Sequence, residues 1–498
     1  MNNQQEEQRS RIIPRWLEYN KTVKTGELTL SRQSPLEINN ATKENIQLDL
    51  QEFTTAPAAL LACRLMGAGI ILGDEQLSHD MATYISKNGG VDLLSANLAD
   101  KILNAGKEKE QVTEVDVRIA SIRKWTSEYH RDAVAWIELA RAFTIKGLKE
   151  KAKKATITAL QLAPYDRYIV RCAVRFFLHT GDYESAWHYV SKASKSHFDP
   201  WIKATEVNVA NISAKSIPAI KKLIPNELSF EQSFHFSELL ESYGYLELES
   251  GNDRKAKKQM RLAWQNPSES VITHAEWIIR NKLPGLKGSS DLEFARSPEA
   301  NTWRNYVELK LDKALEAAQE WALEEPYSKY PFIVGACIAS NADKPEIGVE
   351  IAARGLMIDP NNRAIINNLC YALLRAGNTV SASKYIKKLY PQNEAVTEND
   401  LIALATVGLY EIKIKNIARG REYYTEVIRK FKQKGRSALQ AEAMLNLAMA
   451  ELDASTSEAK AIAMKALSNT ERVQAPSVLL VREIVRRKLL ALNLKGGP

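Results

Sequence analysis

A chain of 498 residues is long enough for about two to four ordinary domains or for one extended repeat array. Its 45% hydrophobic and 26% charged residues exclude an intrinsically disordered chain, and no apolar run is long enough to span a bilayer. The net charge of +8 falls mainly after residue 250 and is not gathered in a stripe, so it only weakly favours a nucleic-acid-binding protein.

The cysteines and the N-terminus favour a reducing compartment. The four cysteines are Cys63, Cys172, Cys337 and Cys370. They are too far apart for CxxC chemistry and have apolar neighbours, so we expect buried free thiols rather than disulfides or metal ligands. The first ten residues are polar and acidic, unlike a signal peptide. Together these features predict a cytoplasmic protein without a membrane-spanning segment.

The first quarter of the chain has no repeat. Residues 1–12 are polar and predicted to be disordered, and Trp16 and Leu17 then supply an apolar anchor. Residues 27–30 alternate like a short strand. Helical patterns fill residues 41–124, and Asn88-Gly89-Gly90 is typical of a helix C-cap. We therefore predict a helical N-terminal domain of unknown kind over residues 13–124.

A repeat begins at residue 133. Trp136, Leu139, Ala140 and Phe143 follow helical spacing, and Gly147 interrupts the pattern. A second helical set ends at Pro164, so one unit is two antiparallel helices joined by a turn. Adding 34 to these positions gives a second unit, and later units end at further prolines. The pattern W-x2-L-small-x2-aromatic, followed by recurring alanines and a final Pro, resembles the tetratricopeptide repeat (TPR) family.

The resemblance implies an all-α, TPR-type helical-hairpin solenoid, wound as a right-handed superhelix, behind the non-repeat N-terminal domain. A Pro- and Gly-rich segment, PGLKGSS, divides the repeats and is typical of a linker. The predicted parts are 1–12 (disordered), 13–124 (helical domain), 125–283 (first TPR block), 284–295 (linker), 296–470 (second TPR block) and 471–498 (capping helix and tail).

The resemblance also implies which side chains face the concave groove, because the first helices of successive TPR units line it. In the first two units these positions include Arg141, Tyr168, Arg171 and Arg175. Guanidinium groups on adjacent helices would suit a carboxylate or a phosphate. The later units contribute a more apolar surface, for which the partner-binding candidates are Tyr245, Asn367, Tyr371, Leu374 and Leu409.

The family's clamp for a chaperone's C-terminal carboxylate is not matched. That clamp needs Lys and Asn at the fifth and ninth positions of one unit and Asn at the sixth position of the next. This sequence has Ile137, Arg141 and Cys172 there. The chaperone-binding function is therefore not transferred to this chain.

The end of the chain is predicted to form an amphipathic capping helix. Its apolar side would hold Val481, Ile484, Val485, Leu489 and Leu492, and its polar side Arg482, Arg486 and Arg487. Apolar side chains in the later groove imply a cover. The cover is either a partner protein or the chain itself, through this helix or through superhelical curling.

No motif indicates catalysis. The chain has no phosphate-binding loop, no HExxH and no paired Cys/His set, so we predict no enzyme activity, no cofactor and no metal. The leading hypothesis is a scaffold or adaptor that binds a protein in its concave groove, as a sensing or assembling subunit of a complex. Two alternatives remain: a helical-repeat RNA- or DNA-binding protein, and a regulator whose activity resides in residues 13–124.

Overall fold

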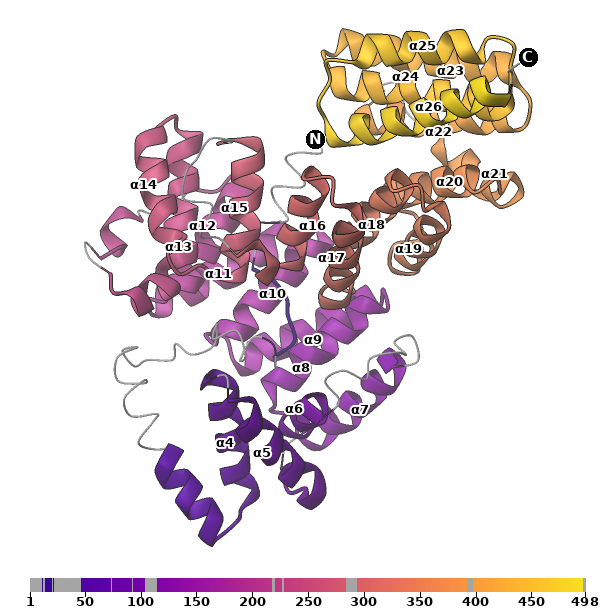
Figure 1. Ribbon diagram of the computed structural model, residues 1–498. Helices are drawn as coiled ribbons and strands as arrows, with labels where there is room; N and C mark the ends of the chain where they lie inside the picture. Colours follow the sequence, from indigo (N-terminus) through magenta and orange to yellow (C-terminus); the bar gives the residue numbers. More distant parts are fainter. Residues whose placement is uncertain are drawn as a thin grey trace. The chain divides into compact units, whose positions relative to one another are not determined.

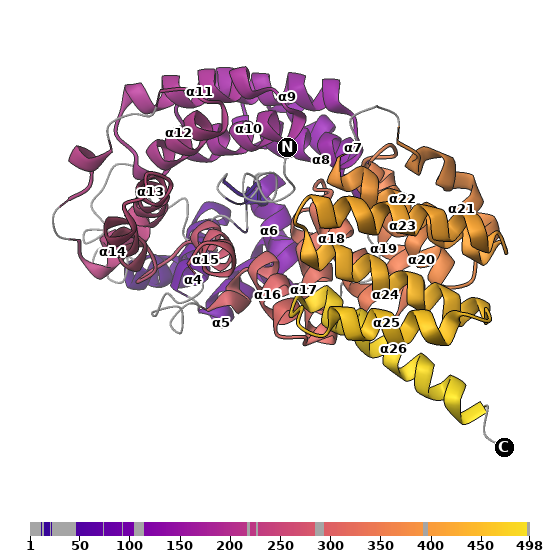
Figure 2. The same ribbon diagram turned by 90° about the horizontal axis from the view of Figure 1, so that it is seen from above.

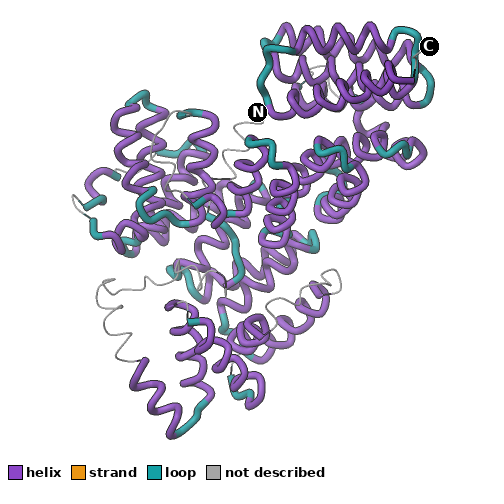
Figure 3. Tube along the Cα trace, in the orientation of Figure 1, coloured by secondary structure: helices purple, strands orange, loops and turns teal. Residues whose placement is uncertain are grey.

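The computed structural model describes residues 11, 14–19, 21, 46–72, 74–91, 93–103, 114–216, 220–225, 228–283, 293–391 and 397–495. Within these ranges the regular elements are all helical (Figure 3), and none of the helices is long and apolar enough to cross a membrane. The strand predicted at 27–30 and nearly all of the predicted linker lie outside the described residues. By chain contacts the protein divides into two compact units, Met1–Ala300 (unit 1) and Asn301–Pro498 (unit 2).

The helices of each unit are marked in Figure 1. Unit 1 contains a helix at 46–55, α4 (Ala59–Leu72), α5 (Glu75–Asn88), α6 (Leu93–Leu103), α7 (Glu114–Glu128), α8 (Ala133–Ile145), α9 (Lys149–Leu162), α10 (Arg167–Thr180), α11 (Tyr183–Ser196), α12 (Pro200–Ile212), η1 (Lys221–Leu223), α13 (Phe230–Glu249), α14 (Asp253–Ala263), α15 (Glu269–Asn281) and η3 (Phe294–Arg296). Unit 2 contains most of α16 (Pro298–Val307), then α17 (Leu311–Glu324), α18 (Tyr330–Asn341), α19 (Pro345–Ile358), α20 (Arg363–Arg375), α21 (Thr379–Ile386), η4 (Lys387–Leu389), α22 (Glu398–Lys413), α23 (Ile417–Gln433), α24 (Ser437–Ala454), α25 (Ala459–Thr470) and α26 (Pro476–Lys495).

These elements confirm the predicted solenoid of helical hairpins. The first helices α8 and α10 begin 34 residues apart, at Ala133 and Arg167. Figure 2 shows α9 and α11 in one row and α8, α10 and α12 in a second row beneath it. The unit after Pro200 is shorter than its neighbours, because the 3-10 helix η1 follows α12 in place of a second α-helix.

Two local features of the sequence produce each hairpin. Asp132 and Asp166 cap α8 and α10 by accepting the backbone N–H three residues later, which satisfies one of the free donors of the first turn. In seven hairpins, from α8/α9 to α22/α23, the fourth residue of the second helix is small, so that the two helices can approach closely. The residues at this position are Ala152, Ala186, Ala256, Ala314, Gly348, Ala382 and Gly420.

The turn between the helices needs a left-handed residue two positions before the second helix. The N–H that follows it bonds to a carbonyl five residues back, as in Leu148 to Phe143 and Asp182 to Phe177. Glycine supplies this conformation at Gly147, Gly181, Gly251 and Gly377, and Leu309, Asp343 and Lys415 adopt it in the other turns. In these later turns the glycine that would mark the repeat in the sequence is replaced by a residue that adopts the same conformation at a steric cost.

Replacing Leu309 (φ 60°) by glycine is expected to raise the free energy of unfolding of unit 2 by about 1 kcal/mol, because glycine adopts this φ without a steric penalty. The side chain is 41% exposed, so little packing is lost. Thermal unfolding of the full chain would measure the change, with Leu309→Ala as the control that keeps the strain. Equal or lower stability of the glycine variant would contradict the prediction.

The C-terminal helix α26 packs on α24 and α25 and closes unit 2 as a capping element. Val481, Ile484 and Val485 are buried, as predicted. The prediction that Arg482 lies on the polar outer side is wrong, since its side chain is 4% exposed and donates to the carbonyls of Thr470 and Val473. Its guanidinium thereby satisfies free carbonyls at the end of α25. Leu492, predicted on the apolar side, is 37% exposed.

Candidate partner-binding surface

The inner side of unit 1 holds a segment of the chain itself. We call residues 14–19, together with Arg11, the N-terminal strap; in Figure 2 it lies inside the arc from α8 to α15. Arg141 donates from Nε to the Trp16 carbonyl at 3.2 Å and from a terminal nitrogen to Glu18 at 3.1 Å. The Tyr168 hydroxyl lies 3.2 Å from the Leu17 carbonyl. Two of the predicted partner-binding residues therefore bind backbone of the same chain.

Glu138 on α8 links the strap to three helices. Its carboxylate accepts from the Tyr168 hydroxyl at 2.6 Å, from Arg118 at 2.7 Å and from the backbone N–H of Tyr19 at 3.2 Å. Burial and then the charge of Glu138 raise the pKa of Tyr168 well above its usual value, so the phenol stays protonated and donates. Glu138 was not among the predicted site residues; the sequence signal for it is an acidic residue inside an apolar helix.

The strap's own arginines enter an acidic cluster at the other side of the arc. Arg11 donates to Glu276 at 2.6 Å and lies 3.3 Å from Glu299. Arg15 lies 3.7 Å from Glu269 and bonds to the hydroxyl of Thr273. The prediction placed residue 11 in a disordered tail, but the Arg11 side chain is completely buried. Complementary charges join the strap to α15 and to the start of α16.

Arg171 and Arg175 are also buried, each 5% exposed. Arg171 forms a bidentate pair with Glu238 of α13, at 2.8 and 3.0 Å, and its guanidinium lies 5.0 Å from the centre of the Trp201 ring. The charge of Arg171 is thus balanced by a carboxylate from a later helix, and the charge of Arg141 by Glu18 of the strap. Tyr245 is 4% exposed and donates to Glu249 at 2.7 Å.

In unit 2 the predicted inner surface is covered by the chain itself. Leu374 and Leu409 are almost completely buried, and the Tyr371 hydroxyl donates to Asn446 of α24 at 2.8 Å. Asn367 is 9% exposed, and its side-chain nitrogen lies 3.3 Å from Asn368. Helix α26 reaches α18 within the same unit. In unit 2, helix α24 of the chain itself therefore covers part of this surface, at Tyr371.

The four cysteines were predicted to be buried, and one of them is exposed. Cys172 and Cys370 are buried and Cys63 is half-buried, but Cys337 on α18 is exposed. All four are free thiols, and no group of three or more potential metal ligands is found in the part of the chain that the structure describes.

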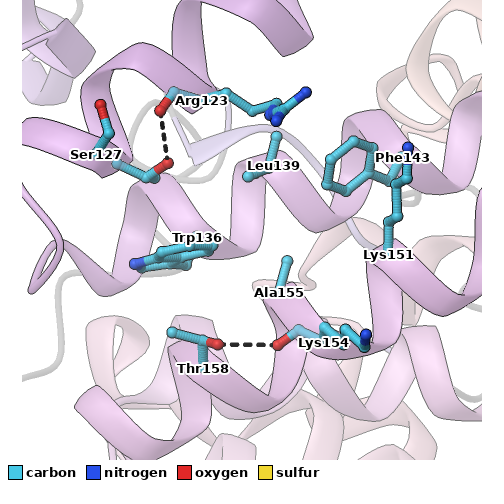
Figure 4. Close-up of a pocket in the computed structure, with 10 residues that line it drawn as sticks. Arg123, Ser127, Trp136, Leu139, Phe143, Lys151, Lys154, Ala155 and Thr158 are labelled. Atoms are coloured by element: carbon cyan, nitrogen blue, oxygen red, sulfur yellow. Dashed lines mark hydrogen bonds between the residues drawn. The ribbon is translucent and has the colours of Figure 1, made fainter.

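An open pocket lies on α7, α8 and α9, outside the predicted positions (Figure 4). It has a volume of about 420 Å³. The residues that line it are Arg123, Thr126, Ser127, Trp136, Leu139, Phe143, Lys151, Lys154, Ala155 and Thr158. Its rim carries three cations, and no carboxylate is among these ten residues. We call it the α7–α9 pocket.

Comparison with known proteins adds to this description. No protein-family model and no curated protein sequence matches the chain. Among solved structures, yeast Tom70 is similar at 13% identity over 86% of this chain and 98% of that chain, with a TM-score of 0.28. The APC/C hetero-tetramer Cut9-Hcn1 is similar at 13% identity over 95% of this chain and 99% of that chain, with a TM-score of 0.35. The P58(IPK) TPR domain is similar at 12% identity over 76% of this chain and 99% of that chain, with a TM-score of 0.22. The hairpins, their spacing and their turns are what identify the TPR-type fold.

Proposed function

We propose that this chain is a non-catalytic scaffold or adaptor of the cytoplasm that binds a protein partner through its helical repeats. The observation that carries the proposal is the strap on the inner side of unit 1. Side chains of α8 and α10 hold a segment without regular secondary structure by its backbone carbonyls at Trp16 and Leu17. Hydrogen bonds to main-chain groups recognise an extended peptide largely independently of its sequence, and neighbouring pockets then add selectivity.

The partner-binding role of the predicted residues is part of the same proposal. Arg141, Tyr168, Arg171 and Arg175 all have partners within unit 1 or are buried there. A partner segment would therefore reach them by replacing contacts that the chain now makes with itself. Tyr245, Asn367, Tyr371, Leu374 and Leu409 would likewise be reached only if their unit opened.

The test is whether the purified full chain forms a stoichiometric complex with a protein that resists nuclease and moderate salt. We expect it to elute from size-exclusion chromatography with such a partner. Elution as a lone chain, or with nucleic acid that is released steeply by salt, would contradict the proposal.

The double exchange Arg171→Glu with Glu238→Arg tests the buried arginine. It keeps an ion pair and reverses its direction. Loss of the partner at an unchanged unfolding temperature would assign the pair to binding, whereas retention of the partner would assign it to the fold alone.

A further inference from the structure

We propose that the α7–α9 pocket is a docking site for an acidic peptide segment of a partner protein that carries at least one large apolar side chain. The inference rests on the proposed function and names a surface for it. At about 420 Å³ the pocket falls in the range of roughly 300 to 1,000 Å³ that binding pockets occupy.

The pocket exists because α7 covers α8 incompletely. In the next repeat the positions 34 residues after Trp136, Leu139 and Phe143 are Val170, Ala173 and Phe177, and all three are 0% exposed. Trp136, by contrast, is only half-buried. Leu139 and Phe143 are 2% and 7% exposed, so the difference between the two repeats lies at Trp136, whose ring stays partly open where the next repeat buries Val170. An apolar side chain of a partner would be stabilised by packing against this ring.

The positive charges at the rim of the pocket favour a negatively charged ligand. Arg123, Lys151 and Lys154 are exposed, and within the described ranges none of them forms an ion pair. The neighbouring Lys146 and Lys153, which do not line the pocket, pair with Asp116 and Asp182. Lys151 instead lies 6.0 Å from the centre of the Phe143 ring. Charge complementarity thus favours a peptide that carries carboxylates on either side of the apolar side chain that enters the pocket.

The uncharged polar groups of the pocket favour binding of a peptide over binding of a nucleic acid, because they are already hydrogen-bonded within the chain. The hydroxyl groups of the pocket are used within their own helices: Thr126 bonds to the carbonyl of Arg123 and Thr158 to that of Lys154 (Figure 4). Ser127 donates to the carbonyl of Lys124, and the Trp136 indole N–H donates to the carbonyl of His130 at 2.9 Å. The edge of an unstacked base needs free donors and acceptors to be read, whereas an apolar side chain needs none.

The test measures binding of a defined probe to the full chain by fluorescence anisotropy. The probe is a labelled Glu-rich helical peptide with Leu and Phe one turn apart, and the comparison peptide has alanine at both apolar positions. We expect the first peptide to bind and the second to bind at least roughly tenfold more weakly. Hydrogen exchange should show protection of α7 and α9.

The charge reversal Lys151→Glu with Lys154→Glu is expected to weaken binding of the first peptide by roughly tenfold or more. The matched control is Lys192→Glu with Lys195→Glu, which reverses two exposed charges on α11 away from the pocket. Three results would overturn the site: no binding of the acidic apolar peptide, equal binding by both double variants, or single-stranded RNA that binds with the same sensitivity to the pocket reversal.

The failure of this site is distinguishable from the failure of the proposed function. A natural protein partner that binds equally to the wild type and to the pocket variant would reject the α7–α9 pocket and leave the scaffold function standing. Absence of any protein partner would reject the scaffold function itself, whereas the peptide titration would still decide the pocket.

Discussion

Replacing Trp16 by alanine is expected to lower the free energy of unfolding of unit 1 by about 3 to 5 kcal/mol, the usual cost of truncating a buried tryptophan. Trp16 is 0% exposed and meets Phe176 of α10 edge to face, with ring centres 6.0 Å apart. The variant would leave a cavity between the strap and the inner helices. The loss of packing would also loosen the carbonyl that Arg141 binds.

The measurement is chemical unfolding of the full chain, followed by hydrogen exchange in α8 and α10. These helices report on unit 1 separately, which matters because a chain of two units need not unfold in one step. Phe230→Ala is the matched control, since that ring is 66% exposed. If Trp16→Ala cost no more than this control, the strap would not be part of the core of unit 1. Trp16→Phe provides a milder variant if the alanine variant does not fold.

Replacing Glu238 by alanine is expected to destabilise unit 1 by about 3 to 5 kcal/mol, because it leaves the Arg171 charge buried without its carboxylate. The side chains of the pair are 6% and 7% exposed, and Glu238 also accepts from Ser268 at 3.2 Å. The double variant Arg171→Leu with Glu238→Leu should cost much less, since it removes both charges at once.

Equilibrium unfolding of the single and double variants would complete a mutant cycle. The control is Asp116→Ala, which breaks an exposed ion pair with Lys146; the side chain of Asp116 is 67% exposed and that of Lys146 is 39% exposed. This variant should change the free energy of unfolding by less than about 1 kcal/mol. A Glu238→Ala variant as stable as this control would mean that water, rather than the carboxylate, satisfies Arg171.

The inward-facing positions illustrate what a repeat pattern can predict. The resemblance to the TPR family implied that Arg141, Tyr168 and Arg171 face the groove; in the structure Arg141 and Tyr168 contact the strap and Arg171 contacts α13. Whether such a side chain is open to a partner is another matter. It depends on Trp16 and Glu238, which lie 125 and 67 residues away from the arginines they contact.

The α7–α9 pocket illustrates the opposite case. Trp136 was used to recognise the repeat, where its position normally belongs to the core. Its exposure follows from the placement of α7, a helix outside the repeat period. Nothing in the residues of α8 alone distinguishes it from the filled position at Val170.

The sequence by itself determined the kind of architecture: helical hairpins with small residues at the closest approach, aspartate caps and left-handed turns. These features depend on neighbours within one hairpin, so a short stretch of chain contains the physical cause. Only the tertiary structure decided that Arg141 is paired with Glu18 of the strap, that Arg171 is paired with Glu238 of α13, and that Arg482 turns inward to the end of α25. The Arg141 contact joins residues 123 positions apart, and the Arg482 contacts form because α26 packs back against α25. The free energy of these contacts comes from excluding water from both partners together.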